Sequence, residues 1–142
     1  MKKKSTLESR LLAGKQKGSV AAEMAIALPL FFFILMGLVD LGRGVAARAT
    51  IGHIAREAAR WASVRGSDSP EPATASSIQT WARARVEGLD PNDMNVNAVW
   101  TPTNDRGGTV EVLVNYTFRP VVPWMPFNSI NLSTSSETTI LN

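Results

Sequence analysis

The stretch Ser19–Val39 decides the fold and reads SVAAEMAIALPLFFFILMGLV, with Glu23 as its one charged residue. A helix needs about 20 apolar residues to cross a bilayer, so this stretch is long enough to span a membrane once. A carboxylate in such a segment costs roughly 2.5–3.5 kcal/mol on insertion scales, and intramembrane charges generally have a partner or a function. We therefore predict a membrane-spanning helix over 19–39 and treat Glu23 as a functional candidate.

The residues before this helix are polar and basic. Residues 1–18 carry six lysines and arginines against one acid, Glu8. Basic residues beside a membrane span stay on the cytoplasmic side, which predicts a cytoplasmic N-terminus and a C-terminal part outside. A secretory signal peptide has a shorter apolar region of about 7–15 residues, followed by a small-x-small cleavage site. Ala47 and Ala49 match that site only weakly, so secretion after cleavage there is the weaker alternative.

Gly18, followed at the fifth position by Glu23, resembles the processing site of type IV-like prepilins. The wider segment from Gly18 to about Ala62 resembles the TadE-like family of minor pilins and pseudopilins from Tad (Flp, tight-adherence) pilus systems. The elements that carry the resemblance are Gly18, Ala22-Glu23, Ala27-Leu28-Pro29, Asp40-Leu41-Gly42-Arg43 and Ala55-Arg56-Glu57. Two positions differ from the family pattern: Met24 replaces an aromatic residue, and Ala58 stands where glycine is common.

The resemblance implies how the chain is processed and what it contacts. A prepilin peptidase is expected to cleave after Gly18, in a recognition site formed by Gly18, Ser19, Glu23 and Met24. The new amine of Ser19 could then pair with Glu23 of an adjacent subunit. The candidate assembly residues are those at family-matched positions together with one aromatic residue in the proline-rich segment PVVPWMPF: Glu23, Pro29, Asp40, Arg43, Arg56, Glu57, Arg60 and Trp124.

For the charged residues after the membrane helix, two interpretations stay equally open. They form either a solvated helix face, with pairs worth about 0.2–0.5 kcal/mol each, or contacts to neighbouring pilins. The implied partners are the prepilin peptidase, the major pilin, other minor pilins, the inner-membrane assembly platform and the membrane itself. The implied location is the bacterial inner membrane in a single pass, with incorporation into the pilus as a further expectation.

Composition excludes several other functions. The formal net charge is +3, but every lysine lies before Ser19, and cleavage after Gly18 would change the net charge to −2. The basic residues therefore set orientation, and no nucleic-acid partner is expected. There is no cysteine, which excludes thiol catalysis and cysteine metal sites. His53 and Glu57 lack a third ligand, and Asp90, Asn92 and Asp93 lack the pattern of a calcium loop. We expect no metal, no cofactor and no enzymatic activity.

The remaining pattern predicts an α+β fold. Apolar residues at spacings of three and four continue the helix over 40–65 and give it an amphipathic outer half. Residues 66–77 form a loop, and 78–88 a short second helix that ends at Gly88. Period-two alternation predicts strands over 94–100 and 109–118, joined as a hairpin around 104–108, and a polar third strand over 130–141. Residues 66–142 thus form a small extracytoplasmic domain with an antiparallel sheet of about three strands.

One alternative from another functional class stays open at this point. The chain could be an uncleaved, permanently anchored extracytoplasmic binding domain, with Glu23 reaching the membrane interface.

Overall fold

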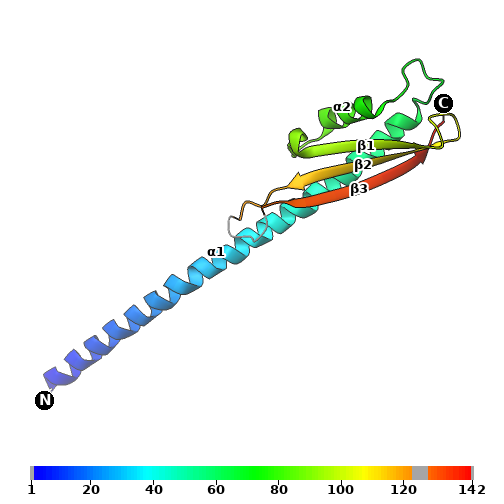
Figure 1. The fold of residues 1–142 in the computed structure, drawn as a ribbon. Helices are drawn as coiled ribbons and strands as arrows, with labels where there is room; N and C mark the ends of the chain where they lie inside the picture. Colours follow the sequence, from blue (N-terminus) through cyan, green and yellow to red (C-terminus); the bar gives the residue numbers. More distant parts are fainter. Residues whose placement is uncertain (1, 123–127, 142) are drawn as a thin grey trace. The chain divides into compact units, whose positions relative to one another are not determined.

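The computed structural model describes residues 2–122 and 128–141, with side chains from residue 19 onward (Figure 1). It confirms the predicted α+β class. In chain order the elements are helices α1 (Lys2–Ser63) and α2 (Ala75–Arg85), the 3₁₀ helix η1 (Pro91–Asp93), and strands β1 (Met94–Thr101), β2 (Thr109–Phe118) and β3 (Ile130–Thr139). The chain forms two compact units, Met1–Val39 and Asp40–Asn142.

The first unit is the N-terminal part of α1. The helix begins at Lys2, so the backbone of the leader is helical, which the sequence analysis did not predict. It continues on both sides of Pro29, although proline cannot donate a backbone hydrogen bond. Large apolar side chains from Val20 to Val39 are exposed within the unit. Among the described residues, Ser19–Ser63 is the one helical segment long and apolar enough to cross a membrane.

The second unit begins with the amphipathic part of α1. The predicted apolar stripe is buried at Ala47, Ile51, Ile54 and Ala58, and Trp61 is half-buried. Ala55, Ala59 and Ala62 widen this face, and their small side chains allow the helix to lie close to the sheet. The helix ends at Ser63, slightly before the predicted end at Arg65.

The sheet has the order β1-β2-β3, and both pairs of strands are antiparallel. On β2 the residues Val110, Val112, Val114, Tyr116 and Phe118 are all buried, as the alternation predicted. Their cross-strand neighbours fix the register: Val112 pairs with Ala98 on β1 and with Ser136 on β3. One face of the sheet is therefore apolar along its centre, and the opposite face is largely polar.

Helix α2 begins earlier and ends earlier than predicted. Thr74 caps it by a reciprocal pair of hydrogen bonds: Ser77 N donates to Thr74 Oγ1, and Thr74 N donates to Ser77 Oγ. This capping box fixes the first turn before Ile78. The helix ends at Arg85 with Val86 as its extended C-cap, while Gly88, at φ +74°, turns the chain beyond the helix.

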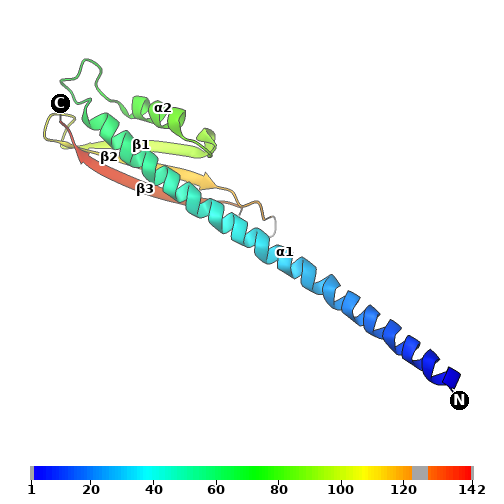
Figure 2. The ribbon, with the colours of Figure 1, turned by 180° about the vertical axis from the view of Figure 1, so that it is seen from behind.

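Both helices cover the same face of the sheet. Figures 1 and 2 show the part of α1 that follows Asp40, coloured cyan to green, along β2 and β3, with α2 over β1. Residues of α1, α2 and all three strands meet in one core cluster. The end of β3 returns to the end of α1, where Leu141 N donates a hydrogen bond to Ser63 O at 2.8 Å.

Candidate functional site

The predicted processing residues lie in the first unit. Ser19, Glu23 and Met24 are exposed along α1, whereas the burial of Gly18 falls outside what the structure describes. Within the described part of the chain, Glu23 makes no hydrogen bond or ion pair. An apolar helix thus presents an unpaired carboxylate, which is consistent with a partner supplied by another molecule. The processing role of these residues stays a prediction.

Asp40 is the first residue of the second unit and is buried, with 4% of its surface exposed. Its carboxylate joins two parts of the chain, α1 and the connection after β2. Arg43 Nη1 donates to Oδ1 at 2.7 Å, one helical turn away. Val121 N donates to Oδ1 at 3.1 Å and Oδ2 at 2.9 Å, and Val122 N donates to Oδ2 at 2.9 Å. The connection after β2 is therefore bound to the base of the outer half of α1; we name this arrangement the Asp40 junction.

Electrostatics at the Asp40 junction favour the ionised carboxylate. Burial raises the pKa of Asp40, but the backbone N–H groups of Val121 and Val122 and the guanidinium of Arg43 oppose this effect. The result is a pKa below the ordinary value of 3.8, because hydrogen bonds to the charged form outweigh the loss of solvent. Asp40 is thus held ionised without needing a partner from another subunit.

Arg43 and Phe118 complete the junction. The guanidinium carbon of Arg43 lies 5.3 Å from the centre of the Phe118 ring, within the range of a cation–π contact. Gly44 lies beside the same ring, since a Cβ at this position would be 3.8 Å from it. The end of β2 therefore packs directly on α1, which brings the Val121 and Val122 amides within reach of Asp40.

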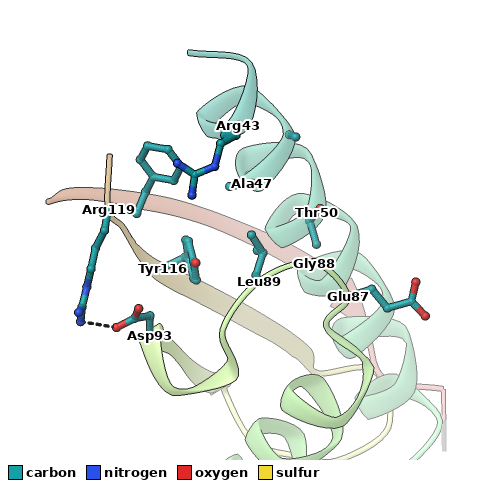
Figure 3. Close-up of a pocket in the computed structure, with 11 residues that line it drawn as sticks. Arg43, Ala47, Thr50, Glu87, Gly88, Leu89, Asp93, Tyr116 and Arg119 are labelled. Carbon is teal, nitrogen blue, oxygen red and sulfur yellow. Dashed lines mark hydrogen bonds and ion pairs between the residues drawn. The ribbon is translucent and has the colours of Figure 1, made fainter. Parts of the chain in front are cut away.

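A hollow of about 380 Å³ opens above the junction (Figure 3). Its walls come from α1, the segment after α2, and the end of β2. Arg43, Ala47 and Thr50 face Gly88 and Leu89 across it, as Figure 3 shows. Arg119 Nη2 donates to Asp93 Oδ1 at 2.7 Å on one side of the opening. Among the described residues that line the hollow, the two cations Arg43 and Arg119 are already ion-paired, so neither is free to bind a small anionic ligand.

The other predicted charged residues lie on the exposed side of α1. Arg56, Glu57 and Arg60 are solvent-exposed, and His53 Nδ1 lies 3.8 Å from Glu57 Oε1 across one helical turn. No group of three potential metal ligands occurs among the residues that the structure describes. These residues can serve a solvated face or an external contact, and the structure leaves both interpretations open. Trp124 lies outside the described residues.

The structure also brings together four residues that the sequence analysis did not connect. Trp61 on α1 and Trp81 on α2 have ring centres 5.8 Å apart. The guanidinium of Arg65 lies 4.3 Å from the Trp61 ring centre, and that of Arg85 lies 4.2 Å from the Trp81 ring centre. The two tryptophan rings thus lie next to each other, each with an arginine over it, and they link α1 to α2. In each pair the two residues are four positions apart, about one helical turn, although Arg65 lies two residues beyond the end of α1. This spacing could have predicted each pair but not the contact between the pairs.

These features define a class of small protein with one candidate membrane helix and one α+β domain that begins where the apolar segment ends. Within this class, residues 18–60 match the model of the family described as TadE-like protein. The resemblance to the TadE-like family is thus confirmed over this segment. No curated protein and no solved structure shows a significant match to the chain.

Proposed function

We propose that this protein is a minor pilin or pseudopilin that takes part in assembly of a Tad (Flp) pilus for surface adherence. It is inserted once in the bacterial inner membrane, with its basic leader inside and residues 40–142 outside. The family match over 18–60 is the observation that carries this proposal. The apolar segment over 19–39 supports the anchor, and the basic leader supports its orientation.

Processing after Gly18 is the second part of the proposal. Cleavage by a prepilin peptidase creates an α-amino group on Ser19, four residues before Glu23. In a bundle of subunits, this amine of one copy pairs with Glu23 of its neighbour. The exposure of Glu23 and its lack of a partner within the described chain support this role. Removing one partner of a buried charge pair typically costs about 3–5 kcal/mol, so a wrong axial register is disfavoured.

The protein acts in this scheme as a structural component and a peptidase substrate, without chemistry of its own. Its partners are the prepilin peptidase, the inner-membrane assembly platform, the major pilin and related minor pilins. The apolar helix joins the bundle of pilin helices, while the exposed side of α1, with Arg56, Glu57 and Arg60, faces neighbouring subunits.

Intact-mass measurement of the protein extracted from membranes tests the proposal. Loss of residues 1–18 is expected, and Gly18→Leu should prevent it. Gly14→Leu is the matched control, since it changes another leader glycine and should leave cleavage intact. A functional protein that retains its leader would instead favour a permanently anchored binding domain. Loss of all residues through about Ala47 would indicate a secreted form.

A further inference from the structure

Four of the seven large apolar side chains that are exposed in the described part of the second unit lie at one end. After Val39, the large apolar side chains exposed in the described residues are Leu41, Val45, Val64, Val99, Val121, Ile130 and Leu141. Four of them, at positions 41, 45, 121 and 130, belong to the end where α1 enters the domain. Val121 binds Asp40 through its amide, and Ile130 pairs with Phe118, which packs beside Gly44.

The helical rise gives the distance of Leu41 and Val45 from the end of the membrane span, measured along α1. At about 1.5 Å per residue, the helix from Ser19 to Val39 is roughly 31 Å long, which matches a hydrocarbon layer of about 30 Å. Leu41 lies about 3 Å and Val45 about 9 Å farther along the helix. The polar layer of a bilayer adds roughly 5–8 Å on each side, so Leu41 lies within it. The side chain of Val45, which leans toward the helix N-terminus, lies at its outer edge.

A carboxylate that needed water for its hydrogen bonds would oppose the placement of Asp40 beside lipid. The Asp40 carboxylate does not need water in this way. Arg43 and the amides of Val121 and Val122 already donate hydrogen bonds to this carboxylate. The same contacts hold Val121 at the level of Asp40, with its side chain 63% exposed. The junction thus satisfies a charge internally and turns apolar side chains outward, a combination suited to the boundary between lipid and water.

We propose that this end of the domain, formed by Leu41, Val45, Val121 and Ile130, is embedded in the outer interfacial layer of the bilayer. The inference rests on the membrane anchoring in the proposed function. The four side chains need not form one patch, because lipid surrounds the helix on every side. Leu41 and Val45 directly follow the span that ends at Val39, which identifies lipid as the partner of this end.

Site-directed spin labelling tests this contact, and the absence of native cysteine makes single-cysteine variants selective. Val121→Cys reports the proposed contact, with Val45→Cys as a second position. Val99→Cys is the matched control, because Val99 is similarly exposed, at 59%, but lies on the polar face of β1. Leu30→Cys reports the span. The full chain is placed in vesicles of phosphatidylethanolamine and phosphatidylglycerol, at fewer than one chain per vesicle, so that a second copy cannot cover the labels.

Two accessibilities of each label are measured: to oxygen, which partitions into lipid, and to a water-soluble nickel chelate. The readout is the first divided by the second. We expect this ratio to be severalfold higher at positions 121 and 45 than at position 99. Equal ratios at 121, 45 and 99, with a lipid-exposed label at 30, would overturn the inference and leave the anchor intact. A nickel-accessible label at position 30 would overturn the anchoring as well. An unchanged far-ultraviolet circular dichroism spectrum verifies that each labelled domain is folded, since a nitroxide quenches nearby tryptophan emission.

Discussion

Ala58 offers a direct test of how closely α1 packs on the sheet. Its side chain is fully buried, and glycine is common at this position in the family that the segment resembles. Replacing it by glycine costs about 1 kcal/mol of helix propensity. It also removes one buried methyl group, worth about 0.8 kcal/mol. We therefore expect Ala58→Gly to lower the free energy of unfolding of the domain by about 1.8 kcal/mol.

The assay is thermal unfolding of the full chain in detergent micelles, followed by tryptophan emission. All four tryptophans lie after residue 60, so the signal reports the second unit without interference from the membrane helix. About 1 kcal/mol shifts the Tm of a domain of this size by roughly 4–8 °C, so the variant should unfold roughly 7–14 °C below the parent protein.

Ala49→Gly is the control, because Ala49 lies on the same helix with its side chain exposed. It should lose only the propensity contribution of about 1 kcal/mol. The difference between the two variants isolates the buried methyl group. If both variants unfold at the same temperature, the small-residue face of α1 is not packed against the sheet as described here, and the reasoning is refuted.

Four further predictions concern charge, turn geometry and helix propensity. Hydrogen bonds from Ser67 and Thr103 lower the pKa of Asp105, and the junction contacts lower the pKa of Asp40. The stability that these two carboxylates contribute should therefore be fully present above their ordinary pKa of 3.8, and it should be lost as the pH falls through their lowered pKa values. Asp40→Asn should flatten this decrease in a pH series followed by tryptophan emission. Glu23→Gln should leave cleavage intact but reduce entry of the subunit into pili, measured by immunoblot of sheared filaments; normal entry would contradict the proposed pairing. Gly108→Ala should destabilise the β1–β2 hairpin, because its Cβ would lie 2.5 Å from Thr103 O. Gly42→Ala, with open space around its Cβ, should stabilise α1 by up to about 1 kcal/mol in the same thermal assay.

Local patterns predicted most of the elements because their signals lie within a few residues. The alternation from Val110 to Phe118 specifies β2, and spacings of three and four around Ile51 specify the buried face of α1. The sequence pattern placed the start of α2 at residue 78 instead of Ala75, because a capping box of Thr74 and Ser77 is less conspicuous than one with glutamate at its third position.

The role of Asp40 could not be predicted from the sequence. Its partners include two backbone amides more than 80 positions along the chain, and every residue except proline carries such a donor. A charged residue at the end of an apolar helix therefore looked like a solvated group or an external contact. The contact between Trp61 and Trp81 was missed for the same reason, since it depends on how two helices meet.

The Asp40 junction also has a mechanical consequence. Under the proposed anchoring, a pull on the membrane helix enters the domain at Asp40, whose carboxylate binds the Val121 and Val122 amides of the connection after β2. β3 then runs alongside α1 to the far end, where Leu141 is tied to Ser63. The outer half of α1 is therefore fastened to the rest of the domain at both ends, so a load along the helix shears the packed interface between these two points instead of peeling it from one end. Such an arrangement suits a subunit that must keep its shape while its anchor is under load.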